Sequence, residues 1–223
     1  MDETADLNAS AGRGAGRSIA EAIKASLTVV GSLLLVMWVI EIVDTVALND
    51  RLQSNGIRPR TGEGLDGVLW SPFLHSGFPH LISNTIPFLM LSALTLTGGL
   101  ARYIKASAII IVLGGGLVWA FAIGSNENHI GASGWVFGLL GFLLAAAVIE
   151  RKPVTIAAGL VALVFYWSLI FGFVPTEGIS WEGHLFGFIA GIAAAKFTTG
   201  STADAIDGPS GGFLSKLQPP EIS

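Results

Sequence analysis

Long runs of apolar residues, separated by short polar links, extend through most of this sequence. A helix needs about 20 apolar residues to cross the hydrocarbon core of a bilayer. Six runs approach or reach that length, although the last one is short for a crossing. The pattern therefore predicts an all-α, polytopic membrane protein built from six helices. The expected spans are residues 25–48, 80–100, 103–123, 133–149, 153–173 and 184–198.

The composition agrees with a membrane domain and excludes several other classes of protein. Of the 223 residues, 52% are hydrophobic and 13% are charged, whereas soluble domains carry about 25% charged residues. The net charge is −4 and the sequence has no basic block, so nucleic acid is not expected as a partner. The absence of cysteine excludes disulfides and thiolate metal sites.

Polar segments flank the apolar region on both sides. Residues 1–24 are rich in Gly, Ala and Ser, and residues 199–223 are polar with Gly and Pro, so both segments are expected to be flexible. The acidic start is unlike a signal peptide, so the first span is expected to be an internal insertion signal. Residues 25–198 then form one membrane domain. Its long connection, 49–77, is too apolar for a solvated loop and is expected to lie partly in the membrane interface.

Lysine and arginine are distributed unevenly between the two ends of the predicted helices. With six crossings, one side holds three arginines, all in the first long connection, and the other side holds nine basic residues. These nine are Arg13, Arg17, Lys24, Arg102, Lys105, Arg151, Lys152, Lys196 and Lys216. Because cytoplasmic loops carry an excess of Lys and Arg, both termini are expected to be cytoplasmic.

Two polar residues lie at the starts of apolar spans. A polar side chain at membrane depth costs free energy, so its presence there indicates a function. Ser133 opens the fourth span and His184 opens the sixth, and the predicted topology places both toward the outer leaflet. A serine becomes a nucleophile only with a base beside it, and His184 is the best-placed base. Because no acid is clearly placed beside His184, a Ser–His dyad is expected rather than a triad.

Acyl transfer also needs hydrogen-bond donors for the oxyanion. His80 and Asn84 are four residues apart at the start of the second span, so they share one face of a helix. Both side chains are able to donate a hydrogen bond. The backbone N–H of Ser133 adds a third donor at a helix N-terminus, where negative charge is favoured.

Small residues on two spans predict that their helices lie close together. Small-xxx-small faces let transmembrane helices approach each other, and a serine and a histidine on different helices need such an approach. Phe137, one turn below Ser133, is expected to pack against the imidazole. The glycines concerned are Gly134, Gly138 and Gly141 on the fourth span, and Gly187 and Gly191 on the sixth.

These motifs together resemble the rhomboid family of intramembrane serine proteases. The Gly-Ala-Ser-Gly sequence at 131–134, which begins with Gly131 and is followed by Phe137, is similar to the family's nucleophile motif, although many members have tyrosine in place of this phenylalanine. His184 and the two glycines after it resemble the family's histidine helix. His75, followed by His80 and Asn84, resembles its second helix. The resemblance covers residues 25–198, in the family's order.

The resemblance implies a serine endopeptidase that works without metal or cofactor. It implies that Ser133 and His184 are catalytic and that His80 and Asn84 stabilise the oxyanion. The implied substrates are single-span membrane proteins, cleaved near the outer membrane face. A gate is implied around the fifth span and the loop at 174–183. The compact plan without disulfides fits a multi-pass protein of a prokaryotic inner membrane.

Three other functions compete with this one. A catalytically silent relative would bind transmembrane helices without cutting them, but it has no need of a paired serine and histidine. A transporter would use Glu41 and Asp44 as an ion path, yet no inverted repeat accompanies them. A zinc protease is disfavoured because the His-Glu-x-x-His motif is absent.

The remaining polar residues have simpler interpretations, and whether His75 or His129 contributes to chemistry is left open. His75 is expected to make a structural bond within the first connection. His129 is expected to be a solvated loop residue. Glu41 and Asp44 are expected to form a hydrated helix end.

Overall fold

The structure is a computed structural model, and it describes residues 3–123, 127–176 and 178–199. Within these ranges the regular elements are all helices, and only two isolated β-bridges occur. This confirms the all-α prediction. The α-helices are α1 (Glu3–Val43), α2 (Gly67–Trp70), α3 (Phe78–Leu96), α4 (Leu100–Ile109), α5 (Gly115–Phe121), α6 (Ser133–Glu150), α7 (Pro153–Tyr166) and α8 (Trp181–Thr199).

Five helical segments of the described chain are long and apolar enough to cross a membrane. They match the first five predicted spans, and α8, of 19 residues, is not among them. One crossing is built from α4, a π-helical turn (Ile110–Gly114) and α5, and another from α7 and a 3₁₀ segment (Trp167–Phe173). The five segments are Lys24–Leu48, Phe78–Leu96, Leu100–Phe121, Ser133–Glu150 and Pro153–Phe173.

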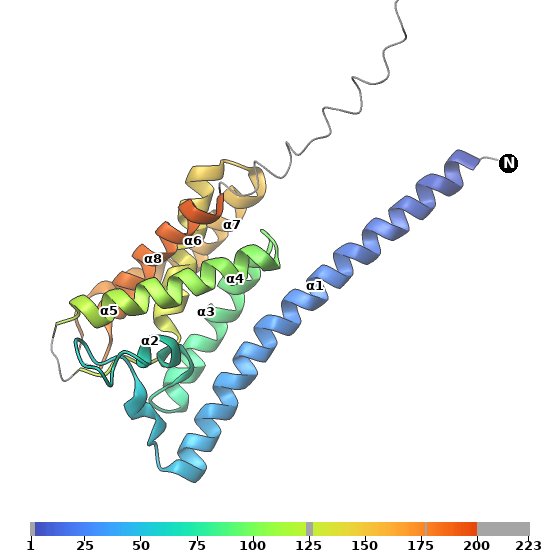
Figure 1. Ribbon diagram of the computed structural model, residues 1–223. Coiled ribbons are helices and arrows are strands. Elements are labelled where there is room, and N and C mark those ends of the chain that lie inside the picture. Colours follow the sequence, from blue (N-terminus) through green and yellow to red (C-terminus); the bar gives the residue numbers. More distant parts are fainter. Residues whose placement is uncertain (1–2, 124–126, 177, 200–223) are drawn as a thin grey trace, which may run out of the picture.

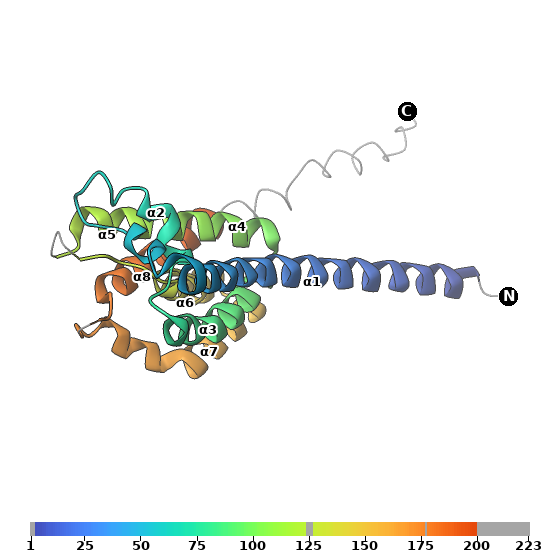
Figure 2. The same ribbon diagram turned by 90° about the horizontal axis from the view of Figure 1, so that it is seen from below.

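Helix α1 is longer than the apolar run that predicted it. It begins at Glu3, and a π-helical turn (Asp44–Leu48) extends it at the other end. Figures 1 and 2 show that the N-terminal part of α1 projects beyond the other helices. The flexibility expected of residues 1–24 stays a prediction. The tail from residue 200 lies outside the described residues, so its flexibility also stays a prediction.

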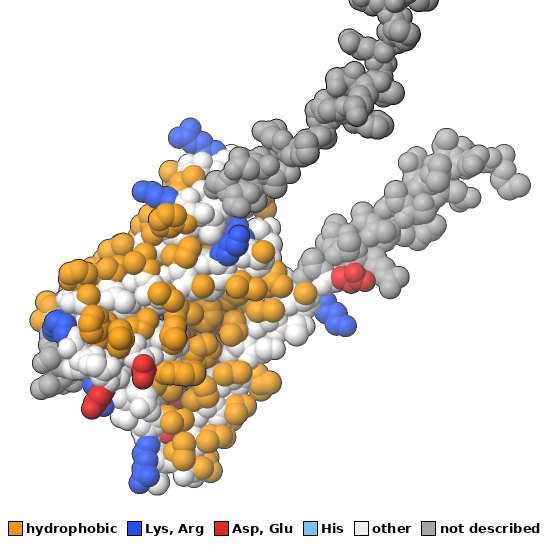
Figure 3. Space-filling model, in the orientation of Figure 1, with side chains coloured by type: hydrophobic (Ala, Val, Ile, Leu, Met, Phe, Trp, Pro, Cys, Tyr) orange, Lys and Arg blue, Asp and Glu red, His pale blue; other side chains and the backbone are white. Residues whose placement is uncertain are grey.

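Helix α6 lies at the centre of the bundle and contacts α8, α7 and α3 (Figure 1). Every residue from 135 to 143 of this helix is buried, as expected of a helix without a polar face. By contrast, the visible outer face of the molecule is largely hydrophobic, with Lys and Arg side chains toward its margins (Figure 3). An apolar outer surface between charged margins is what a bilayer requires.

The approach of α6 and α8 depends on glycine. A Cβ atom on Gly191 would overlap the carbonyl oxygen of Gly138, and one on Gly187 would overlap the carbonyl oxygen of Gly134. The two backbones therefore touch, and any larger side chain would push the helices apart. The structure thus has the close approach that the glycine spacing predicts, and this approach brings the start of α6 beside the start of α8.

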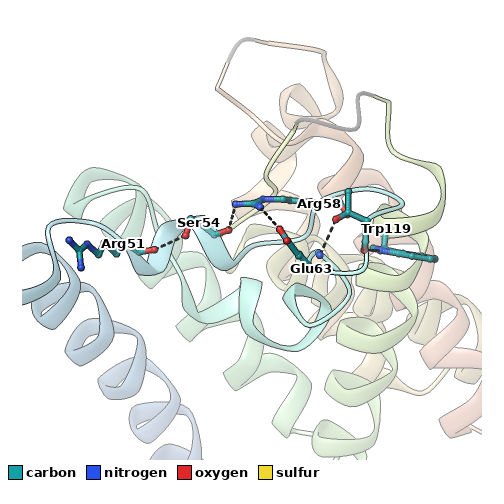
Figure 4. A network of polar contacts seen from close by, with 7 residues as sticks. Arg51, Ser54, Arg58, Glu63 and Trp119 are labelled. Carbon is teal, nitrogen blue, oxygen red and sulfur yellow. Dashed lines mark hydrogen bonds and ion pairs between the residues drawn. The ribbon is translucent and has the colours of Figure 1, made fainter.

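The first long connection folds over the bundle and is tied to the end of α5. Arg60 donates its backbone N–H to the Trp119 carbonyl at 2.9 Å, and the Trp119 indole N–H donates to the Thr61 carbonyl at 2.8 Å (Figure 4). Arg58 bridges the Ser54 carbonyl and the Glu63 carboxylate in the same network. These bonds satisfy polar groups within the connection and hold it against the helices.

The acidic residues near the end of the first span are buried, so the expected hydrated helix end is wrong. Glu41 is 1% exposed and Asp44 is 2% exposed. The backbone N–H of Leu52 donates to Asp44 Oδ1 at 2.8 Å. The reason is tertiary, because the chain after the π-helical turn folds back over this side of α1 and covers both carboxylates.

Candidate active site

The segment that carries Ser133 is held by the first long connection. Gly131 has a φ of +111°, a conformation that side chains rarely adopt, and its N–H donates to the Ser71 carbonyl at 2.9 Å. The Ala132 N–H donates to His75 Nε2 at 3.3 Å. The turn therefore reaches α6 in a defined position, with Ser133 as the first residue of the helix.

His75 anchors the nucleophile motif. It is 1% exposed, and it accepts the Ala132 N–H from outside the first connection, in addition to an interaction with the Phe73 backbone inside it. An imidazole nitrogen that accepts an N–H must be unprotonated, so His75 is neutral in this geometry. Burial is the main cause that lowers the pKa of His75 to about 3, and the nearby His80 lowers it further.

The geometry around His184 suits a general base. Its Nδ1 lies 2.7 Å from the Gly172 carbonyl oxygen, which only accepts hydrogen bonds, so Nδ1 carries the proton. Nε2 then has a free lone pair. The ring stacks on Phe137 with centroids 4.1 Å apart and planes 4° apart. The packing expected of Phe137 is thus present, and the carbonyl and the aromatic ring together fix the imidazole rotamer.

One cavity of about 1150 Å³ brings the predicted residues together from three helices. Between Ser133 and His184, both described, the structure has no hydrogen bond, and such bonds often tighten only when substrate binds. Among the described residues, no three His, Cys, Asp or Glu side chains gather as a metal site would need. The predicted residues that line the cavity are His80, Asn84, Ser133, Phe137 and His184.

His80 and Asn84 lie on the α3 side of this cavity with N–H groups available. The Ser76 N–H approaches His80 Nδ1 at 3.4 Å, and the Ser76 hydroxyl lies 3.1 Å from the same atom. If Nδ1 accepts, Nε2 carries the proton, and a Cβ atom on Gly131 would lie 2.6 Å from that nitrogen. Asn84 donates one amide N–H to the His80 carbonyl at 3.0 Å, which leaves its second N–H for another acceptor.

The expectation that His129 is a solvated loop residue was wrong. It is 5% exposed, and its Nδ1 lies 2.5 Å from Ser180 Oγ. Its backbone forms a β-bridge with Ile57, and this bridge holds His129 against the first long connection. Burial lowers the pKa of His129, while the neighbouring Glu182 and Glu127 partly oppose this shift.

Sequence reasoning missed two residues of this site. Gly172 supplies the carbonyl that orients His184, and a Cβ atom on it would lie 2.9 Å from His184 Nδ1. It stands in an apolar run with nothing to distinguish it. Ser180 had a local signature, because a serine directly before the first residue of a helix is typical of an N-cap.

Comparisons with known proteins agree with this arrangement. The Rhomboid domain model matches residues 64–201. An uncharacterized protein of Mycobacterium tuberculosis is 42% identical over 167 residues, which cover 71% of this chain and 69% of that protein. RHOMBOID-like protein 5 of Arabidopsis thaliana is 35% identical over 66% of this chain and 46% of its own length. Rhomboid protease GluP of Bacillus subtilis is 33% identical over 55% of this chain and 24% of its own length.

Proposed function

Because this chain belongs to the rhomboid family, we propose that it is an intramembrane serine protease that cleaves single-span membrane proteins near the outer membrane face. Ser133 is the nucleophile and His184 is the general base. The observation that carries the proposal is the cavity lined by both Ser133 and a histidine held with Nδ1 protonated. A helix-binding protein without activity does not need that tautomer.

The proposed reaction has the usual two halves of acyl transfer. His184 Nε2 takes the Ser133 hydroxyl proton while Ser133 Oγ attacks the substrate carbonyl carbon. The imidazolium that forms keeps its Nδ1–H on the Gly172 carbonyl. It then gives the Nε2 proton to the leaving amine as the peptide bond breaks. Water, activated by the same nitrogen, hydrolyses the acyl-enzyme and restores the serine.

Three donors stabilise the oxyanion in this proposal. The Ser133 backbone N–H lies at the N-terminus of α6, where the helix dipole favours negative charge. The Nε2–H of His80 and the second amide N–H of Asn84 approach from α3. Gly131 permits this approach, since a side chain there would occupy the space of the His80 ring. Donors fixed before the reaction cost no reorganisation when charge develops.

The chain is an integral membrane protein, and we propose that α8 makes a sixth crossing with both termini in the cytoplasm. The distribution of basic residues supports this topology, because six crossings place nine Lys and Arg residues on the cytoplasmic side and three on the other side. Arg51, Arg58 and Arg60 then lie on the outer side with the first connection. Similar proteins in mycobacteria fit a prokaryotic cell membrane.

Cleavage of a single-span reporter in proteoliposomes tests the function. Wild type should cut, and Ser133→Ala and His184→Ala should not. Ser32→Ala is the matched control, since this serine is exposed on α1, away from the cavity. If wild type fails to cut but a fluorophosphonate labels Ser133, the active site is present and the reporter is the wrong substrate. Failure of both would favour the silent, helix-binding alternative.

A further inference from the structure

A hydrogen bond joins the two segments that carry the catalytic pair. His129 lies four residues before Ser133, and Ser180 lies four residues before His184. His129 Nδ1 and Ser180 Oγ are 2.5 Å apart. The bond therefore connects the approach to α6 with the approach to α8, on the side of the bundle where both helices begin.

Ser180 is fixed to the start of the histidine helix. The Gly183 N–H donates to Ser180 Oγ at 3.2 Å, and the His184 N–H donates to the Ser180 carbonyl at 3.2 Å. This is the bonding of an N-cap residue. Because one lone pair of the hydroxyl oxygen is already engaged, its single O–H is free to donate to His129 Nδ1. The position of Ser180 Oγ thus moves with the first turn of α8.

His129, which precedes α6, is fixed to the first long connection. Its backbone exchanges two hydrogen bonds with Ile57, at 2.9 and 3.0 Å. The ring is buried, and Nε2 has no hydrogen-bond partner in the part of the chain that the structure describes. The charged neighbours of the ring are Glu182 and Glu127, and the Ile123 N–H donates to Glu182 Oε1 at 3.4 Å. The backbone bonds to Ile57 and the burial of the ring therefore fix the His129 imidazole on its side of the bond to Ser180.

We infer that the His129–Ser180 hydrogen bond is a positioning device that sets the distance between Ser133 and His184, an inference that rests on the proposed protease function. The two catalytic side chains belong to separate helices, so their alignment depends on how those helix starts are held together. Glycine contacts set the spacing of the α6 and α8 backbones. The hydrogen bond between the segments that precede the two helices adds a directional restraint to that spacing. Small displacements matter, since about 1 Å of misplacement can cost about 100-fold in rate.

His129→Phe, with His129→Asn as the rescue, tests this role. Phenylalanine keeps the ring and removes Nδ1, whereas the asparagine amide places a polar atom close to the position of Nδ1. We expect His129→Phe to lower kcat about tenfold, which corresponds to about 1.4 kcal/mol, with KM within about twofold. The rate of fluorophosphonate labelling at Ser133 should fall in parallel. His129→Asn should recover most of kcat.

Ser92→Ala is the matched control, because Ser92 also makes a buried side-chain hydrogen bond, to the Tyr103 hydroxyl at 3.1 Å, and neither residue lines the cavity. Its kcat should stay within about twofold of wild type. Melting temperatures show whether each variant folds, and if His129→Phe does not, Ser180→Ala and its rescue Ser180→Thr replace the histidine pair. Folded His129→Phe with wild-type kcat and labelling would overturn the inference and leave the protease function standing. Absence of activity and labelling in wild type would overturn the function itself.

Discussion

Gly172→Ala is a sharp test of how His184 is oriented. The added Cβ would lie 2.9 Å from His184 Nδ1 and 2.5 Å from Phe137 Cζ. Ordinary contacts begin at about 3.4 Å, so the two rings must retreat by about 0.5 Å (3.4 − 2.9) and about 0.9 Å (3.4 − 2.5). The stack leaves the imidazole little other room, because its centroid lies 4.1 Å from that of Phe137.

The shift should reduce the rate much more than it reduces stability. Displacement by about 0.5–0.9 Å lengthens the bond from Nδ1 to the Gly172 carbonyl and turns Nε2 away from Ser133. By the rule that about 1 Å of misplacement costs about 100-fold, we expect kcat to fall between about 10- and 100-fold. Overpacking of this size destabilises by about 1–3 kcal/mol, which leaves most of the protein folded.

The assay is single-turnover cleavage of a membrane-embedded reporter, with thermal unfolding measured on the same samples. Gly116→Ala is the matched control, because a Cβ atom on this helical glycine meets nothing within 4 Å. Phe137→Leu in the Gly172→Ala background should return part of the lost rate by making room for the imidazole. Wild-type kcat in folded Gly172→Ala would refute the orientation argument, as would the same loss in Gly116→Ala.

Three further predictions follow from the same geometry. Asn84→Ala should lower kcat about 100- to 1000-fold without unfolding the protein, because one of the proposed oxyanion donors is lost; near-normal single-turnover rates would remove Asn84 from the mechanism. His75 has its pKa lowered by burial from 6.5 to about 3, so the unfolded chain binds its proton more readily, and stability is complete above about pH 6.5 and falls below it. Between pH 7.5 and 5.5, wild type should lose about 1.4 kcal/mol more than His75→Gln in equilibrium unfolding, and equal losses would contradict the neutral, buried histidine. Gly191→Ala should lower the melting temperature, because its Cβ would overlap the Gly138 carbonyl, whereas Gly31→Ala, which meets nothing within 4 Å, should not.

Most of the helices and several site residues were accessible from the sequence because they depend on local pattern. An apolar run of about 20 residues predicts a spanning helix whatever surrounds it, and the first five runs correspond to helices that meet this criterion. The placement of Ser133 and His184 at two helix starts follows from where those runs begin. The stacking of Phe137 on His184 follows from its position one helical turn after Ser133.

The errors have a common cause, which is that burial of a polar residue depends on what folds over it. Glu41 and Asp44 lie near the boundary of an apolar run, a position that predicts a hydrated helix end. The chain that folds back after the π-helical turn nevertheless buries both side chains. His129 reads as a solvated residue because its neighbours in the sequence are polar. Its partners, Ile57 and Ser180, are 72 residues before it and 51 residues after it in the chain, so no local pattern announces them.

The sequence by itself determined that the chain is all-α, that it enters a membrane, and which helices carry Ser133 and His184. Hydrophobic length and helical spacing are properties of neighbouring residues, so they can be read along the chain. Only the tertiary structure decided the state and the orientation of those side chains. The Gly172 carbonyl selects the tautomer of His184, and the bond from His129 to Ser180 joins the two helix starts. Such contacts join residues far apart in the chain, and they exist only once the helices have packed.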